Sequence, residues 1–382
     1  MNASGTPLFT AQPFAQGFTN ADASNNLSSL QKAFPDTTLG YVPRTPTSQL
    51  SDRVAGPHYA VPRLGQWNLS AQVRFLRTLS FDAGYVGSQG RRLLIAHGLN
   101  QPLLAGAANP VNCGYDGVAA HCVTTNTSQN AGMRVPLMGE TPTALAVNEF
   151  AGSSAYHSLQ TTLRRQSSHG LAFQAAYTFS RAANNTTLYN DPNNLALDWA
   201  RASFDRTHRF TANFDYQLPG RWTLAGIVIV QSGLPLTLTD PNGGGVYGHA
   251  APSTITLCPG ARYASLETGG SIDARLNRWI DAGAICSPAA IGADGSTGYG
   301  NSGQSIMIGP GQLNTDFSLG KTAHVGGLRE DAMLAFRVEF YNALNHPQFA
   351  NPGTALGTAT FGVITQNSVA PRLIQFAVKY LF

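Results

Sequence analysis

Charged side chains are scarce in this sequence of 382 residues. Asp, Glu, Lys and Arg make up 12% of it, against about 25% in an average soluble globular protein. A soluble chain of this size would cover its surface with charge. Much of this surface therefore either faces something other than water or is solvated by neutral Asn, Ser, Thr and Gln side chains.

Long apolar runs are also missing. No stretch approaches the roughly 20 consecutive apolar residues of a transmembrane helix, and the most apolar run, Leu224 to Val230, is short and rich in β-branched residues. If the protein lies in a membrane, we expect it to cross as strands. The segment Met1 to Gly5 has neither the positive flank nor the apolar core of a secretory signal.

Signatures of enzymes and of nucleic-acid binding are absent as well. The formal net charge is only +4 and the basic residues are scattered, so nucleic acid is not expected as a partner. Ser153, Ser154 and His157 lie close in sequence without a G-x-S-x-G motif, which favours strand residues over a hydrolase site. The run Gly243 to Gly245 lacks a following Lys-Ser/Thr and is predicted to be a loop tip. We predict no catalytic residues, no cofactor and no metal.

What the sequence does contain is period-two alternation, which predicts half-buried or lipid-facing strands. In the clearest segment, Leu171 to Ser180, the odd positions are apolar or aromatic and the even positions are small or polar. About nine such segments occur from Trp67 onward, most about ten residues long, which is the length that a tilted strand needs to cross a bilayer. The other clear segments are Trp67 to Phe75, Arg209 to Tyr216, Leu334 to Tyr341 and Ile374 to Phe382.

The connections between these segments alternate between short and long. Short links are predicted near Arg77 and at 167–170, 218–221 and 321–331, and long links rich in Gly, Asn, Pro and Ser at 91–155, 181–206, 240–311 and 346–371. Outer-membrane barrels show this asymmetry, with tight periplasmic turns at one rim and long extracellular loops at the other. A soluble sandwich has no reason to place every long loop at one end.

The four cysteines fall within two of the long links. Cys113 and Cys122 lie in one and Cys258 and Cys286 in another, so pairing within each link would close modest loops in an oxidising compartment. The sequence leaves open whether either disulfide forms, because it does not give the distance between the two cysteines of each pair. A zinc site that uses His121 beside Cys122 lacks paired C-x-x-C spacing and is disfavoured.

The polar face of the predicted strands carries most of their charge, where a lumen or a plug would accept it. A second group, Asp205, Arg206, His208 and Arg209, is the densest polar cluster; a loop-to-strand ion-pair network is favoured over contact with a ligand in the lumen or at the outer rim. Aromatic residues near segment ends suit an interfacial girdle: Trp67, Tyr85, Tyr177, Tyr216, Tyr380 and Phe382. The predicted lumen-facing polar residues are Arg74, Arg164, Arg209, Asp215, Asp316, Arg337, Glu339 and Lys379.

Eight short sequence motifs resemble, in their order and spacing, the barrel of the Oar-like TonB-dependent transporters of acidobacterial type. The resemblance covers the chain from about Trp67 to Phe382. The motifs are QWNLS (66–70), GYVGSQG (84–90), YHSLQ (156–160), AYTFS (176–180), FDRTHRF (204–210), QSGLP (231–235), FRVEFYNALNHP (336–347) and PRLIQF (371–376).

The resemblance implies an all-β fold: an antiparallel transmembrane β-barrel segment of about nine to ten strands from a parent barrel of about 22. Residues 1–65 would be an extracellular loop or irregular lead-in, and residues 66–382 the C-terminal portion of the barrel. Family members carry a plug, a TonB-contacting segment and a signal peptide, none of which is seen in this sequence. We therefore expect a fragment in the Gram-negative outer membrane. An open sheet in lipid would also leave two unpaired edges, so the chain alone should not form a stable barrel.

The function implied for the intact parent is energy-coupled uptake of a large nutrient; the alternative is a passive porin or an adhesin-like surface protein. Expected partners are outer-membrane lipid, the barrel-assembly machinery, an unknown ligand, and the TonB complex only through the missing plug. The C-terminal residues that resemble the assembly signal are Phe376, Val378, Tyr380 and Phe382.

Overall fold

The computed structural model describes residues 53–56, 60–114, 118, 120–137, 142, 146–248, 253–327 and 330–382. Most of residues 1–65, the predicted lead-in, therefore lie outside the described residues. The part that is described includes a short strand, β1 (Arg53–Ala55), which pairs in parallel with the far end of a long strand.

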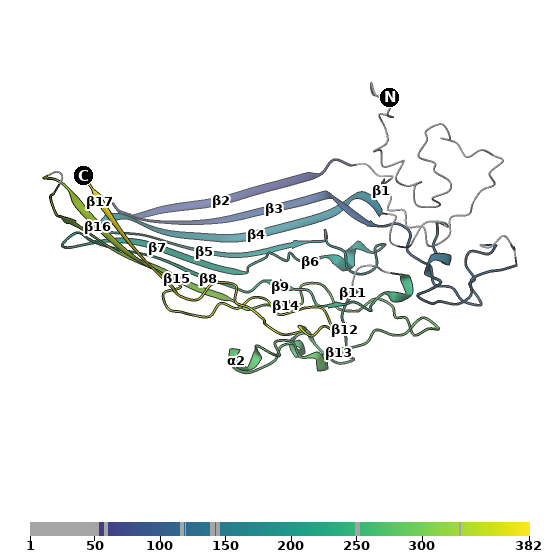
Figure 1. Cartoon of the computed structure of the whole chain (residues 1–382). Helices are drawn as coiled ribbons and strands as arrows, with labels where there is room; N and C mark the ends of the chain where they lie inside the picture. The colour runs from purple at the N-terminus through teal and green to yellow at the C-terminus, as the bar shows by residue number, and fades with distance from the viewer. Residues whose placement is uncertain are drawn as a thin grey trace, which may run out of the picture.

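One curved antiparallel sheet dominates the described chain (Figure 1). Nine strands follow one another along it, each antiparallel to its neighbours, and a short strand, β6 (Ala200–Arg201), pairs with the end of one of them. This confirms the prediction of an all-β antiparallel fold with about nine strands. The nine are β2 (Arg63–Leu76), β3 (Leu79–Gly98), β4 (Ala146–Ser168), β5 (Leu171–Asn184), β7 (His208–Leu218), β8 (Trp222–Gln231), β15 (Gln312–His324), β16 (Met333–Tyr341) and β17 (Leu373–Leu381).

The strands are longer than the predicted ten residues in several places. β3 and β4 have 20 and 23 residues and extend far into the predicted loop 91–155. The pairing of β3 with β4 shifts register twice, between Arg91 and Leu93 and between Leu93 and Ile95. Each bulge inserts a residue and interrupts the period-two pattern. The outer parts of both strands could therefore not be recognised from the alternation of apolar and polar residues. Similarly, β15 continues to His324, into the predicted link 321–331.

All four short links lie at one end of the sheet and all four long links at the other (Figure 1). The short links span 77–78, 169–170, 219–221 and 325–332, and the long links span 99–145, 185–207, 232–311 and 342–372. Two of the tight turns use consecutive residues with positive φ: His169 and Gly170, and Gly220 and Arg221. Such turns match the twist of the flanking strands.

The sheet is open along the described chain. β2 and β17 form its two edges and do not pair with each other. Side chains on both faces of β2 are exposed along all 14 residues. This arrangement is consistent with a fragment of a barrel. Among the described residues, no helix is long and apolar enough to cross a membrane.

The principal apolar core lies in the long links rather than in the sheet. Leu238, Ile255 and Leu266 are fully buried there, together with Trp279 and Ile280, in a cluster to which links 232–311 and 342–372 both contribute. The short elements of the long links are β9 (Pro235–Leu236), β10 (Thr239–Asp240), β11 (Ser253–Thr254), β12 (Thr256–Leu257), β13 (Ile285–Cys286), β14 (Met307–Ile308), α2 (Ile272–Arg275), and the 3-10 turns η2 (Ala131–Met133), η3 (Leu195–Asp198), η4 (Gly245–Tyr247), η5 (Tyr263–Leu266) and η6 (Ala282–Ala284).

Candidate functional site

The ladder register divides the main sheet into an apolar face and a polar face. Residues directly opposite each other in an antiparallel pair point to the same side, so the pairs trace each face across all nine strands. On the apolar face, large side chains such as Leu69 and Phe376 stay 76% and 68% exposed. Exposure of this kind in regular strands suits contact with lipid rather than water.

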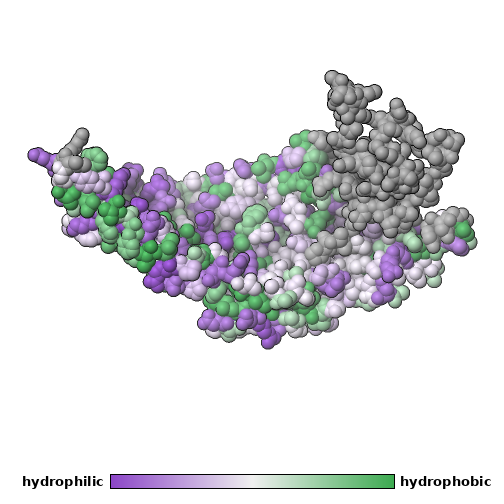
Figure 2. All heavy atoms as spheres, in the orientation of Figure 1, coloured by the Kyte–Doolittle hydropathy of each residue, from purple (hydrophilic) through white to green (hydrophobic). Residues whose placement is uncertain are grey.

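Aromatic rings close two gaps on the apolar face. The Trp67 ring lies over Gly87, where a Cβ would come within 2.3 Å of the indole. Likewise, the rings of Phe214 and Phe317 approach each other over Gly226, with centroids 6.2 Å apart. A ring laid across a strand glycine restores the packing that the missing side chain would have provided. Figure 2 shows apolar and polar residues side by side along the strands.

The polar face is the candidate functional surface. One row of the ladder runs from Arg74 through Arg164 to Asp316, and the next row holds Asp215 and Glu339. Alternation along the same strands adds the remaining predicted residues, Arg209, Arg337 and Lys379. The register thus places all eight predicted charged residues on one face. Two large apolar residues, Ile227 and Ile229, share this face and interrupt its polarity at β8.

A hollow of about 590 Å³ opens in the middle of this face. Its lining includes Arg164 from β4, Asp215 from β7, Asp316 from β15 and Glu339 from β16. Because the long polar side chains line the hollow, the polar face is the concave side of the sheet. An incoming polar segment or solute would meet three carboxylates and an arginine there.

Most of these charges have local partners. The Glu339 carboxylate lies 3.1 Å from the guanidinium of Arg337. Asp316 accepts hydrogen bonds from the backbone N–H of Asn342 at 2.8 Å and from the side chain of Asn314 at 3.1 Å. Each carboxylate is thereby held in place while part of it remains open to the hollow. The arrangement suits docking of a polar surface.

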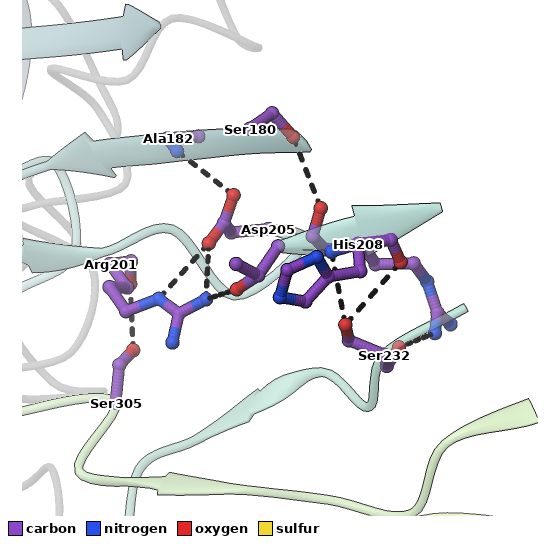
Figure 3. A network of polar contacts seen from close by, with 9 residues as sticks. Ser180, Ala182, Arg201, Asp205, His208, Ser232 and Ser305 are labelled. Atoms are coloured by element: carbon purple, nitrogen blue, oxygen red, sulfur yellow. Dashed lines mark hydrogen bonds and ion pairs between the residues drawn. The ribbon is translucent and has the colours of Figure 1, made fainter. Parts of the chain in front are cut away.

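The predicted polar cluster at 205–209 is divided by the structure (Figure 3). Asp205 is buried and accepts hydrogen bonds from Nη2 of Arg201 at 2.7 Å and from the backbone N–H of Ala182 at 2.9 Å. Arg206 donates to the carbonyl oxygen of Ser232. This is the loop-to-strand network that the sequence favoured, but its cation, Arg201, was not anticipated. Arg201 lies outside the predicted strands, so alternation gave no signal for it.

The other two members of that cluster lie on opposite faces. His208 is on the apolar face, where its Nδ1 lies 2.8 Å from the hydroxyl oxygen of Tyr177. Arg209 is on the polar face. Of the candidate hydrolase residues, register places Ser154 on the polar face, and Ser153 on the apolar face with His157 but four residues away along β4. The Nδ1 of His157 instead lies 2.7 Å from the hydroxyl oxygen of Tyr85.

Buried polar residues fasten the long links to one another. The Arg134 side chain is fully buried and donates to the carbonyl oxygens of Leu103, Thr127 and Val246. Burial lowers the pKa of this guanidinium. Burial raises the pKa of Asp198, whose Oδ1 accepts hydrogen bonds from Gln304 and from the backbone N–H of Tyr189. These residues lie in predicted loops, where sequence pattern gave no indication of a fixed structure.

The four cysteines form two disulfides within the long links, Cys113 with Cys122 and Cys258 with Cys286. Cys122 is therefore not available as a thiolate for a zinc site with His121. Of the predicted girdle residues, Trp67, Tyr85, Tyr177, Tyr216 and Tyr380 all lie on the apolar face by register, and Phe382 follows the end of β17. Phe376, Val378 and Tyr380 share that same face of β17; their role as an assembly signal stays a prediction.

Three features of this antiparallel sheet are typical of transmembrane β-barrels: an exposed apolar face, a concave polar face, and short links at one end with long links at the other. The chain belongs to the outer membrane beta barrel domain family, whose model matches residues 1–375. It is accordingly a protein of the outer membrane.

Solved structures similar to this chain include two transporters and an import receptor. The outer membrane transporter YddB from Escherichia coli is 10% identical, with a TM-score of 0.42, over 86% of this chain and 34% of that one. The FrpB iron transporter from Neisseria meningitidis is 10% identical, with a TM-score of 0.40, over 86% and 33%. The ferric-catecholate import receptor Fiu from E. coli is 9% identical, with a TM-score of 0.40, over 89% and 32%. The chain spans about a third of the length of each of these. No curated protein sequence matches the chain.

Proposed function

We propose that this chain forms part of the barrel wall of an Oar-like TonB-dependent transporter, which takes up a large nutrient with energy supplied from the inner membrane. The observation that carries the proposal is the concentration of charge on the concave face. Eight charged residues from six strands share that face with the hollow, and they are Arg74, Arg164, Arg209, Asp215, Asp316, Arg337, Glu339 and Lys379.

Such a wall suits a removable plug. Fixed carboxylates with open lone pairs, as at Asp316 and Glu339, can hold a polar domain through hydrogen bonds without the apolar contact that would make the association permanent. TonB would act on that plug, which the intact protein supplies outside the described residues. The ligand class stays open between siderophore, oligosaccharide and peptide.

The test compares uptake in three strains of the source bacterium: the parent, a deletion of this gene, and a deletion of tonB. Radiolabelled ferric siderophores, oligosaccharides and peptides are supplied in turn. We expect one class to lose most of its uptake in both deletion strains. Uptake lost with this gene but retained without tonB would refute energy coupling and favour a passive porin. Unchanged uptake together with lost surface attachment would favour an adhesin.

Sidedness is tested by labelling single cysteines with a membrane-impermeant maleimide. Ala293→Cys lies in an exposed part of the long link 232–311, and Arg77→Cys lies in an exposed tight turn. We expect the first to react in intact cells and the second only after the outer membrane is permeabilised. The native cysteines give little background because all four are in disulfides.

A further inference from the structure

The apolar face of the sheet carries charge of one sign only. Over the regular ladder, its charged residues are all basic, and the acidic residues of the same strands, Asp82, Asp215, Asp316 and Glu339, all point to the polar face. Beyond the bulges, Glu149 pairs with His97 at 3.0 Å. The basic residues on the apolar face are Arg63, Arg91, Arg165, Arg181 and Lys321, with His157 and His208 among them.

The basic residues at the two ends of the strands differ in their surroundings. At the end with the tight turns, Lys321 lies over the ring of Trp222 at 4.6 Å, and Arg165 donates to the carbonyl oxygen of Ser168 at 3.4 Å. At the end with the long links, Arg63, Arg91 and Arg181 are exposed, and apart from the backbone pairing of the sheet no side-chain hydrogen bond or ion pair joins them to any other described residue.

Two of these arginines lie directly opposite each other. Arg63 of β2 faces Arg91 of β3 in the ladder. Residues paired in this way have Cβ atoms about 5 Å apart, and like charges at that spacing are destabilising. Further along the face, Arg181 lies opposite His157, whose ring stacks near Tyr85 with centroids 6.2 Å apart. Within the part of the chain that the structure describes, the outer end of the apolar face therefore concentrates cations that no acidic side chain pairs with.

The position of Arg63 and Arg91 corresponds to the lipid headgroups, and Arg181 shares the ladder row of Trp67 through Gly87 and His157. Trp67 and Tyr85 mark the level of the interface on the same face, and Leu159 and Phe179, which continue the ladder row of Tyr85, are about half exposed. Arg63 lies four residues beyond Trp67, which is roughly 13 Å along the strand and about 10 Å in height for a strand tilted by 45°. Headgroups occupy this zone, outside the hydrocarbon.

We propose that Arg63, Arg91 and Arg181 form a binding site for the phosphate groups of an anionic lipid in the outer leaflet of the outer membrane. Guanidinium groups bind phosphate through paired, charge-assisted hydrogen bonds. A phosphate between Arg63 and Arg91 turns their repulsion into attraction, and the exposed apolar residues below receive the acyl chains. Charge complementarity and the adjoining apolar surface together select a lipid over a soluble anion.

The test uses the full-length protein, extracted from its own outer membrane in mild detergent. Tightly bound lipid is separated from bulk lipid, and its phosphate is quantified per protein molecule. The variant is R63Q/R91Q/R181Q, and the matched control is R74Q/R164Q/R209Q, which removes the same charge from the polar face. We expect the bound lipid phosphate per protein molecule to fall at least five-fold in the variant and to stay at the wild-type amount in the control. Equal retention in all three proteins would overturn the proposal.

A second arm separates the possible anions. Purified protein is mixed with vesicles of phosphatidylglycerol or phosphatidylcholine, in the presence and absence of millimolar inorganic phosphate. We expect binding to phosphatidylglycerol that the triple variant lacks and that inorganic phosphate does not abolish. Loss of binding with inorganic phosphate would indicate a free-anion site instead, and capture of an acidic protein without lipid would indicate a protein interface; either result overturns the proposal.

If the triple variant fails to reach the outer membrane, R63Q alone relieves the facing pair and is expected to lose about half of the bound lipid. Because no uptake is measured, the outcome is independent of the transport function.

Discussion

The network around Asp205 allows a prediction about how a loop is fixed to the outer end of the sheet. The Asp205 side chain is 1% exposed and that of Arg201 is 23% exposed. One carboxylate oxygen accepts from Nε and Nη2 of Arg201, and the other accepts from the backbone N–H of Ala182. In Asp205→Ala, the guanidinium loses its anion and a buried N–H loses its acceptor.

The expected cost follows from that burial. Removing one partner of a buried ion pair costs about 3–5 kcal/mol, and we take about 3 kcal/mol because Arg201 is partly exposed. Local opening should then rise by roughly 150-fold, since 1.4 kcal/mol corresponds to a factor of ten. Asp205→Asn keeps the oxygen that accepts from Ala182 and loses the charge, so about 1.4 kcal/mol, or roughly ten-fold, is expected.

The assay is hydrogen exchange of the full-length protein in outer-membrane vesicles, read at the amides of Ala182 and Ala202. The amide of Ala202 donates to the carbonyl oxygen of Ala182, so both report on the same junction. Ser180→Ala is the control; it removes one neutral hydrogen bond to the carbonyl oxygen of Arg206, worth about 1 kcal/mol. If Asp205→Ala exchanges no faster than Ser180→Ala, the ion pair does not fix this junction and the reasoning fails.

Three further predictions concern other parts of the chain. Because burial raises the pKa of Asp198, the folded state holds this proton more tightly than the unfolded state does; stability should fall as pH rises above the ordinary value of 3.8, and Asp198→Asn should flatten this dependence in urea titrations. Gly226→Val would place a side chain where two aromatic rings lie within 2.8 Å, so we expect the free energy of unfolding to fall by about 1–3 kcal/mol, seen as a lower urea midpoint. Gly295→Val is the control, because the space around that residue is open and only its positive φ opposes the substitution. Replacing both Cys258 and Cys286 by Ser should destabilise the outer links by about 2–4 kcal/mol, measured as faster proteolysis of 232–311 with the sheet left intact.

The sequence pattern predicted the sheet well because lipid imposes a simple rule on it. Every second residue of a spanning strand must be apolar, and the other face must tolerate charge, so Arg74, Asp215 and Glu339 could be assigned to one face without coordinates. The rule fails where the ladder bulges. Near Arg91 and Leu93 an extra residue shifts the period, and the strands continue where the pattern suggests a loop.

The outer links could not be predicted in the same way. Their core of Leu238, Ile255 and Leu266 is assembled from short strands that pair across large sequence separations, as Thr239 does with Thr254. Segments of two residues carry no periodicity. The disulfide positions were visible in the sequence, whereas the full burial of Arg134 depends on carbonyl groups contributed by three separate turns.

The open sheet constrains how the barrel is completed. β2 and β17 each expose one row of backbone N–H and C=O groups, and in hydrocarbon every unpaired group costs several kcal/mol. Nine alternating strands leave these two edges running in the same direction, so joining them directly would require a parallel seam. Antiparallel closure instead requires an odd number of strands in addition to the nine, whether they come from the same polypeptide or from another. A partner with an even number of strands, including one that itself closes into a barrel, cannot satisfy both edges in this way. The charged concave face points to the same requirement, because its carboxylates become a lumen wall only when the remaining strands enclose them.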